Sequence, residues 1–529
     1  MTRLAPALAT FAQDRLERAW RYLLEGPAQP ASPAATAREL GPPRVLLPGE
    51  RATVLDEYGR LRVSPGVAAG LGATVGSLPA ETGAVLGLTG DVINRYFFDE
   101  RASRTRATYA PDIDFVNAER RAMLTSGTLL CGFAHSHPRD FWCPSEPDRE
   151  YAERLLQKVR VQELVIPIVQ PASGSGAPVL HWFYARVNDQ GYAEVHRVEA
   201  DIVTAPLPGQ FARVAGAYDV EWLKRCRVIA VGCGGAREAI EDLARIGVEQ
   251  FVLIDPQDVA PENLGTQSVQ RNEIGRPKVL ACSDAIARIN PDAAIVTIQR
   301  RIQEIPPRQL AVLLTGGWLG LGAPAASLVG AWSDSPSANA YAHRAGLNAG
   351  LPVVQAVLHR AAASGEIALA FPGRTRGCVR CATESRYAHY LQSGANDATS
   401  AGAPLWATTR LNALKLCVVV AALHAADAGE PDTVSPERAA QTRLLEQIAQ
   451  RPLALLRLAP DASVVSGLRT HEAVFAGASR PDRILFDETV WREVEPRPGC
   501  ADCGGTGDLR AAIARIDDFD AIPDRRTAA

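Results

Sequence analysis

Two histidines and an aspartate between residues 129 and 148 have the spacing of metal ligands. His135 and His137 end the mostly apolar run LLCGFAHSH, and residues two apart on a β-strand point to the same face of a sheet. Asp148 follows in the segment PSEPD, which is typical of the start of a helix. Two imidazoles and a carboxylate are a common ligand set of catalytic Zn²⁺, and they leave a fourth position for water. The sequence therefore predicts a zinc site built from a strand and a helix.

A zinc hydrolase also needs a base that takes a proton from the attacking water. The first candidate is Glu81, an acid in the otherwise apolar, glycine-containing segment PAETGAVLG. Zinc makes hydroxide available near neutral pH and polarises a carbonyl group, so a carboxylate beside it can act in hydrolysis. We therefore expect Glu81 to lie close to the predicted ligands.

These residues together resemble the JAMM motif of JAB/MPN-type zinc isopeptidases. The resemblance rests on the sequence HSHP at 135–138, then Ser145 and Asp148, with Glu81 upstream in an ETGxxLG context. It implies that His135, His137 and Asp148 bind Zn²⁺ and that Glu81 is the general base and then the acid. It also implies that Ser145 stabilises the oxyanion. A helix-capping box explains Ser145 and Asp148 without a metal, and the two roles are compatible.

Four of the ten cysteines form two CxxC pairs, Cys378/Cys381 and Cys500/Cys503. Ten cysteines in 529 residues are too few for a disulfide scaffold, and in a reducing compartment a CxxC pair favours metal binding. Four thiolates are typical of a closed, structural zinc site, which would join the C-terminal segment to the rest of its domain. A redox-active pair, or two unrelated pairs, is the alternative.

A glycine turn between two predicted strands indicates a nucleotide site. The strand at 227–231 is followed by Gly232, Gly234 and Gly235, a helical run, and a second strand that ends at Asp255. In such an arrangement backbone amides approach phosphate at a helix N-terminus, and the acid binds the ribose hydroxyls. The strict GxGxxG pattern is not met, and dehydrogenases use a similar turn. The glycines alone therefore do not decide which nucleotide binds.

The downstream segments resemble the ThiF/MoeB family, which adenylates ubiquitin-like proteins. The resemblance spans most of residues 220–505 and rests on the acid after the second strand and the segments ENLxxQ and IGxxK. It also includes an Asp-Ser pair before a helix, a GLPVV strand and the CxxC pairs. It implies ATP and Mg²⁺ as cofactors. Asp255 would bind the ribose, and Asp334 would hold Mg²⁺. The phosphates would be contacted by Asn263, Gln267 and Lys278.

The chain departs from this family at three points. Thr266 directly precedes Gln267, and Asn339 lies in the predicted helix after Asp334. At both positions the family commonly has arginine. Arg237 or Arg271 is a candidate replacement for the missing charge. No cysteine follows Cys381 in the region where thioester-forming members carry one. The cysteines considered in its place are Cys143, Cys233 and Cys282, whereas Cys417, in the apolar run ALKLCVVVAAL, is expected to pack in the core.

The elements that must position these residues predict an α/β multidomain protein. An N-terminal helix and a Pro/Ala-rich linker are expected at 1–43. Short strands broken by turns predict an α+β JAB/MPN-like zinc peptidase domain at 44–204. Strands alternating with helices then predict a Rossmann-like ThiF/MoeB-type adenylation domain, with the tetracysteine zinc site, at 205–529.

Composition sets limits on partners and location. The net charge of −3 and the lack of a long basic run give no reason to propose nucleic acid as a partner. We expect no membrane-spanning segment and no secretory signal, and hence a cytoplasmic protein. A homodimer is an expectation from the resemblance alone.

The two domains together predict processing and activation of a ubiquitin-like protein. A zinc-dependent (iso)peptidase would cleave after its C-terminal glycine, and the second domain would adenylate the exposed carboxylate with ATP. A ubiquitin-conjugating-type enzyme is the expected next partner if transfer proceeds through a thioester. One alternative is activation of a sulfur carrier for thiocarboxylate-based sulfur transfer. Another is a ubiquitin-like-binding scaffold whose adenylation domain is inactive.

Overall fold

The computed structural model describes most of the chain beyond residue 53. Its contacts divide the chain into two compact units, Met1–Ala205 with Trp318–Leu321, and Pro206–Gly317 with Gly322–Ala529. The predicted N-terminal helix and linker (1–43) lie outside the described residues. The described residues are 54–56, 58–78, 81–104, 109–125, 127–138, 141–158, 163–171, 177–188, 190, 192–204, 209–318, 321–393, 402–426, 434–458 and 488–511.

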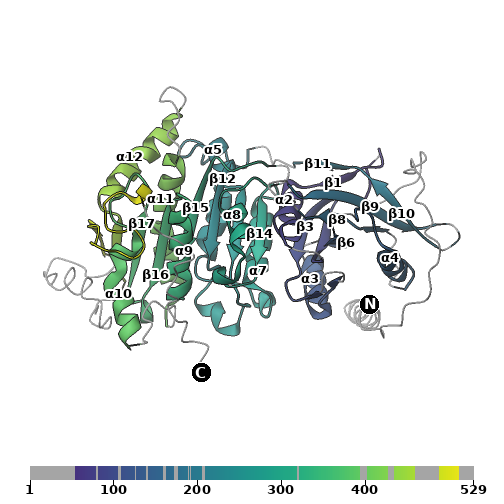
Figure 1. Cartoon of the computed structure of the whole chain (residues 1–529), viewed down its shortest axis with the longest axis horizontal. Coiled ribbons are helices and arrows are strands. Elements are labelled where there is room, and N and C mark those ends of the chain that lie inside the picture. The colour runs from purple at the N-terminus through teal and green to yellow at the C-terminus, as the bar shows by residue number, and fades with distance from the viewer. Residues whose placement is uncertain are drawn as a thin grey trace, which may run out of the picture. The chain divides into compact units, whose positions relative to one another are not determined.

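The first unit is built on a mixed β-sheet, visible in Figure 1. Within the described residues its strands follow the order β10-β9-β7-β6-β2-β3-β1-β11, and β8 pairs with β6 and β9. Helix α4 packs against β7, β9 and β10, and helix α3 packs against β6. The bounds are β1 Leu61–Val63, α2 Pro65–Ala73, β2 Gly83–Thr89, β3 Val92–Phe98, β4 Ser103–Arg104, β5 Tyr109–Ala110, α3 Ile113–Thr125, β6 Leu129–Ser136, α4 Glu146–Lys158, β7 Glu163–Val165, β8 Ile168–Gln170, β9 Val179–Val187, β10 Ala193–Val198 and β11 Ala200–Ile202.

Strand β6 lies at the centre of this sheet, between β2 on one side and β7 and β8 on the other. It is buried from Cys131 to Ser136, and such a continuous run without alternation is typical of a central strand covered on both faces. The predicted strand at 129–135 is therefore confirmed, and it ends one residue later than expected.

The second unit is a doubly wound α/β unit. Its sheet has the order β14-β13-β12-β15-β16-β17-β18-β19, in which β14 to β16 are parallel and the following pairs are antiparallel. Figure 1 shows its helices along the sheet. The bounds are α5 Val220–Lys224, β12 Cys226–Val231, α6 Arg237–Arg245, β13 Gln250–Ile254, α7 Lys278–Ile289, β14 Ala294–Ile298, α8 Pro307–Leu314, β15 Ala326–Ala331, α9 Pro336–Asn348, β16 Val353–Leu358, β17 Ser364–Ala370, α10 Val379–Ser393, α11 Leu405–Ala425, α12 Pro436–Gln450, β18 Leu453–Arg457 and β19 Glu488–Arg492.

The strand order reverses between β12 and β15. From β12 the chain first adds β13 and β14 on one side and then crosses to add β15 and β16 on the other. In such sheets ligands bind at the carboxyl ends of the strands beside the reversal point. The predicted glycine turn follows β12, Asp255 follows β13, and Asp334 lies three residues after β15. The topology thus brings three distant segments to one edge, and the predicted fold class is confirmed.

Helix α11 bears on two expectations from the sequence. Among the described helices it is long and apolar enough, by length and composition, to cross a membrane, a property that the sequence analysis overlooked. It packs against α6, α12 and strands β15 to β17, and 56% of its apolar window is buried. Cys417 on this helix is exposed, so the expectation that it packs in the core was wrong.

Candidate functional sites

The predicted zinc ligands of the first unit meet at one point. His135 Nε2 lies 2.9 Å from His137 Nε2, and the Asp148 carboxylate oxygens lie 3.1 Å and 3.2 Å from these two nitrogens. Both histidines are buried, and Asp148 is partly buried. Strand β6 supplies the histidines and the first turn of α4 supplies the aspartate, as the sequence predicts.

This geometry fits a tetrahedral zinc ion. Bonds of about 2.0–2.1 Å to nitrogen or oxygen place ligand atoms about 3.3 Å apart, close to the distances found here. Burial opposes ionisation of Asp148, but contacts with His135 and His137 outweigh it and hold the pKa of this carboxyl well below its usual range. Three such groups, aimed at one point with the carboxylate ionised, are suited to hold a divalent cation.

Glu81 lies beside this cluster. It precedes β2 and lines, together with His135 and Asp148, a cavity of 220 Å³. Burial raises the pKa of Glu81, while the nearby histidines act in the opposite direction. A carboxylate with a raised pKa is a better general base than one with an ordinary pKa. The predicted base is thus close to the predicted ligands and has a suitable environment.

Tyr109 connects Glu81 to the rest of this site. Its backbone N–H donates to Glu81, and its ring stacks on His135 with the two ring planes 8° apart. The ring also lies over Gly83, where a Cβ atom would come within 2.3 Å of it. The glycine of the ETG segment is therefore required by the close approach of Tyr109, a contact that the sequence alone does not reveal.

Ser145 forms a helix cap at the start of α4. Its hydroxyl donates to Asp148 Oδ2 at 2.6 Å, and its backbone N–H contacts the same oxygen at 2.7 Å. The capping alternative therefore describes this structure, and the cap also fixes the Asp148 carboxylate toward the histidines. An oxyanion role for Ser145 requires its hydroxyl to turn away from Asp148.

The four CxxC cysteines of the second unit form one cluster. Three of the distances between their Sγ atoms are 3.6 Å, 3.7 Å and 3.8 Å. Zinc–sulfur bonds of about 2.3 Å in a tetrahedron place sulfurs about 3.8 Å apart, whereas a disulfide requires about 2.05 Å. The cluster thus fits a structural zinc ion, and it brings the two pairs together, which contradicts the alternative of two unrelated pairs. Its members are Cys378, Cys381, Cys500 and Cys503.

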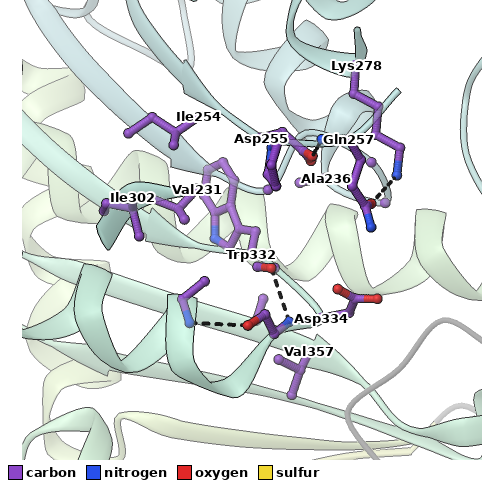
Figure 2. A pocket seen from close by; sticks show the side chains of 18 of the residues that line it. Val231, Ala236, Ile254, Asp255, Gln257, Lys278, Ile302, Trp332, Asp334 and Val357 are labelled. Atoms are coloured by element: carbon purple, nitrogen blue, oxygen red, sulfur yellow. Dashed lines mark hydrogen bonds between the residues drawn. The ribbon is translucent and has the colours of Figure 1, made fainter. Parts of the chain in front are cut away.

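A cavity of 420 Å³ lies at the reversal point of the second sheet. In Figure 2 Asp255, Gln257 and Lys278 lie on one side of it, and Trp332 and Asp334 lie toward the other. Seven of the eight predicted nucleotide-binding residues line this cavity. They are Gly232, Gly234, Gly235, Asp255, Gln267, Lys278 and Asp334.

The glycine turn is held open for a ligand. Gly232 has a φ of +98°, and a Cβ atom there would come within 2.7 Å of the Trp332 carbonyl group. The turn is anchored on one side by Asp255, which accepts from the Cys233 N–H at 2.9 Å. Asn412 of α11 donates to the Gly235 carbonyl oxygen at 2.9 Å and so holds the turn from the other side, at the N-terminus of α6, where phosphate commonly binds.

Three buried polar atoms in this cavity have no hydrogen-bond partner among the described residues, and one of them is the acceptor Oε1 of Gln303. The other two are the acceptor Oε1 of Gln267 and the donor Nε1–H of Trp332, in residues that are 6% and 7% exposed. An unsatisfied buried polar group costs free energy, so such atoms are expected where a ligand or water completes the bonding. A nucleotide offers both acceptors and donors, and the cavity fits it on these grounds.

Three arginine-related expectations have different outcomes. Arg237 is buried in ion pairs with Glu241 and Glu273 and does not line the cavity, so it does not replace the missing phosphate clamp. Arg271 is exposed and is also absent from the cavity lining. Asn339 forms two hydrogen bonds to the Ser333 backbone and thereby holds the loop that carries Asp334.

Asn263 is the predicted residue that the structure does not bring to the cavity. Its Oδ1 accepts from the Ala260 N–H at 2.9 Å and caps the short 3₁₀ helix Pro261–Gly265. The sequence analysis instead missed cavity residues from other segments, because none belongs to a recognised motif. These are Gln257, Arg300, Arg301, Trp332, Thr408, Asn412 and Lys415.

Burial separates the cysteines considered for a thioester. Cys233 and Cys282 are buried, and burial raises the pKa of the Cys282 thiol to about 12 and that of Cys233 well above its ordinary value. A thiol needs access and a low pKa to act as a nucleophile. Cys143 is partly exposed, but it lies in the first unit, not in the unit with the nucleotide cavity.

Fold and sites thus define a nucleotide-binding α/β unit with a four-cysteine metal site, preceded by a unit with a hydrolase-type metal site. Two family models match the chain accordingly. The model of the ThiF family matches residues 209–475, and the model of prokaryotic homologs of the JAB domain matches residues 71–190. The chain therefore belongs to the ThiF family and carries a JAB-like domain before the ThiF domain.

Curated relatives match a short stretch. The molybdopterin-synthase adenylyltransferase of Salmonella typhimurium is 40% identical over 86 residues, which are 16% of this chain and 34% of the relative. The SAMP-activating enzyme E1 of Haloferax volcanii is 32% identical over 80 residues, which are 15% of this chain and 30% of the relative. The chain thus spans about a third of the length of these relatives. A similar solved structure is Escherichia coli MccB with ATP, at 15% identity and a TM-score of 0.35, covering 53% of this chain and 67% of that one.

Proposed function

We propose that this protein processes a ubiquitin-like protein and then activates it. The first unit cleaves the peptide bond after the C-terminal glycine, and the second adenylates the glycine carboxylate with ATP. The convergence of seven predicted residues on one cavity at the sheet reversal carries this proposal. Membership of the ThiF family supports it, as do relatives named as an adenylyltransferase and a SAMP-activating enzyme.

Adenylation needs no general base, because the glycine carboxylate is already ionised. One carboxylate oxygen forms a bond to the α-phosphorus of ATP, the bond from that phosphorus to the bridging oxygen breaks, and pyrophosphate leaves with the electron pair. The amides at the glycine turn bind phosphate, Asp255 binds the ribose, and Asp334 is placed to hold Mg²⁺. Burial raises the pKa of Asp255, and the charge of Lys278 acts in the opposite direction.

Peptide cleavage depends on His135, His137 and Asp148 as metal ligands and on Glu81. Zinc, when bound there, polarises the scissile carbonyl and lowers the pKa of water. Glu81 takes a proton from the attacking water as its oxygen bonds to the carbonyl carbon. Glu81 then gives that proton to the leaving amine as the C–N bond breaks. The cleavage product ends in the free glycine carboxylate that the second unit requires.

A second candidate, activation of a sulfur carrier without a thioester, is favoured by the burial of Cys233 and Cys282. In that case sulfide or a persulfide attacks the acyl carbon of the adenylate, and AMP leaves. The exposed cysteine of the second unit, Cys417, does not line the nucleotide cavity. The fate of the adenylate therefore separates the two candidates.

Intact mass spectrometry tests the proposal. A ubiquitin-like precursor encoded beside this gene is incubated with the zinc-loaded protein, with and without Mg²⁺-ATP. We expect trimming to the glycine without ATP, followed by an AMP-sized mass gain with ATP. Trimming without any ATP-dependent product or pyrophosphate exchange would contradict adenylation. An ATP-dependent product on an untrimmed precursor would contradict the order of the two steps.

A further inference from the structure

The nucleotide cavity contains a buried cation that belongs to none of the recognised motifs. Lys415 of α11 lines the cavity and is 1% exposed. Its ammonium group donates to Asn412 Oδ1 at 2.8 Å and lies 4.3 Å from the centre of the Trp332 ring. Neither partner is negatively charged, and the structure gives Lys415 no ion pair among the described residues. Glu238 of α6 interacts with this charge electrostatically but forms no ion pair with it, and burying a cation without an ion pair is costly, so its presence calls for a function.

Lys415 lies toward the end of the cavity at which the reaction would occur. The ribose site at Asp255 follows β13, and the phosphate site at Gly232 to Gly235 follows β12, the next strand of the sheet. A nucleotide in this orientation points its phosphates toward β15. Trp332 follows β15 directly, and Asn412 links Lys415 to the Gly235 carbonyl oxygen. The ammonium group is therefore beside the phosphate site and on its β15 side.

The other cations of the cavity lie on the opposite side. Arg300 and Arg301 follow β14, and Lys278 donates to Gln257, which follows β13. Among the described lining residues, Lys415 is thus the cation of the β15 side. The same side carries the indole N–H of Trp332, which is buried and has no hydrogen-bond partner in the described part of the chain. A cation and an unsatisfied donor next to each other form a site for an anion.

We propose that Lys415 binds the anions that meet at this end of the cavity, the α-phosphate of ATP and the glycine carboxylate, with the Trp332 indole N–H as a second donor. This inference rests on the proposed adenylation. Two anions must approach each other in that reaction; their negative charges favour the protonated form of Lys415, and its positive charge lowers their repulsion. Thr266 supplies no charge, and Arg237 is bound to Glu273 and Glu241. Lys415 supplies the charge from a different element.

Lys415→Met removes the charge with little change of length, and Lys415→Arg keeps it. Trp332→Phe removes the N–H and keeps an aromatic ring, and Lys224→Met on the surface of α5 is the matched control. Binding of ATP and of adenosine to the zinc-loaded full chain is measured by calorimetry. We expect Lys415→Met to weaken ATP binding about tenfold or more and to leave adenosine binding unchanged. Lys415→Arg should recover most of the ATP affinity. Trp332→Phe should lower the ATP affinity a few-fold.

The same variants are then assayed for ATP–pyrophosphate exchange with the trimmed ubiquitin-like protein. We expect Lys415→Met to lower exchange, and Lys224→Met to match the wild type. Unchanged ATP affinity in Lys415→Met would overturn the inference, because it would show that Lys415 does not contact the phosphates. An equal loss of ATP and adenosine affinity would also overturn it, because it would indicate a structural role for Lys415. If ATP–pyrophosphate exchange persists at the wild-type rate in Lys415→Met, the proposed role of Lys415 is refuted and the proposed adenylation is not. If the wild type binds ATP more tightly than Lys415→Met but catalyses no ATP–pyrophosphate exchange, the proposed adenylation is refuted and the phosphate contact of Lys415 is retained.

Discussion

Asp502 and Arg344 join the second CxxC pair to helix α9 through a contact of 2.6 Å between Asp502 Oδ1 and Arg344 Nε. Asp502 lies between Cys500 and Cys503, is 1% exposed, and also contacts His343 Nδ1 at 3.1 Å. Burial opposes ionisation, but His343 and Arg344 lower the pKa of Asp502 below its ordinary value. Helix α9 begins two residues after Asp334. Through Asp502, the segment with the second CxxC pair therefore contacts the helix that follows the predicted Mg²⁺ ligand, and it helps to hold that helix in position.

Replacing Asp502 by alanine should destabilise the second unit and reduce its activity. The change leaves Arg344 and His343 without their buried partner, and breaking a buried ion pair typically costs about 3–5 kcal/mol. Denaturant unfolding measures the loss, and ATP–pyrophosphate exchange measures the effect on the cavity. Asp508→Ala is the control, because its pair with Arg510 lies on the surface and such pairs contribute little. Equal stability of both variants would show that the link to α9 does not matter.

Zinc content should separate the two metal sites. We expect two zinc ions per chain in the wild type and one in Cys378→Ser, with a lower unfolding temperature, because structural zinc contributes directly to folding free energy. Atomic emission and thermal unfolding provide the measurements. Cys417→Ser, an exposed cysteine outside the cluster, should keep both ions. Retention of two ions in Cys378→Ser would contradict the tetracysteine site.

Sequence patterns identified the sites where their residues lie close together in the chain. The strand with His135 and His137, and the strand, glycine turn and helix after Cys226, are determined by local spacing and were found with bounds within two or three residues. Lys415 was not found, because it lies 180 residues after the glycine turn, in a helix whose apolar residues show almost no preferred face. The same lack of periodicity explains the wrong expectation for Cys417.

Glu81→Gln should abolish peptide cleavage and leave zinc binding intact. The amide keeps the size of the side chain and its contact with the Tyr109 N–H, but it cannot accept the proton of the attacking water. Loss of a general base typically lowers the rate about 10²–10⁴-fold. Cleavage of the ubiquitin-like precursor and zinc analysis are measured on the same sample, with the exposed Glu150→Gln as control. Cleavage at the wild-type rate would remove Glu81 from the mechanism.

Lys415→Met should stabilise the ligand-free protein at low pH even though it weakens ATP binding. Burial lowers the pKa of Lys415 from 10.5 to about 7 in the folded state, with Glu238 of α6 acting in the opposite direction. Below pH 7 both folded and unfolded states hold the proton, and the full cost of burying the charge is present. Between about pH 7 and pH 10.5 only the unfolded state holds it, so stability rises with pH in this window.

Methionine at this position has no charge to bury, so the difference in unfolding free energy between Lys415→Met and the wild type should be largest near pH 6. It should shrink toward pH 9, with a slope of at most about 1.4 kcal/mol per pH unit. Urea unfolding of the zinc-loaded protein at several pH values measures it, and Lys224→Met should show no such trend. A difference independent of pH would mean that Lys415 is not a buried, titrating cation. A stability gain that accompanies lost ATP affinity is the expected behaviour of a residue held in place for binding.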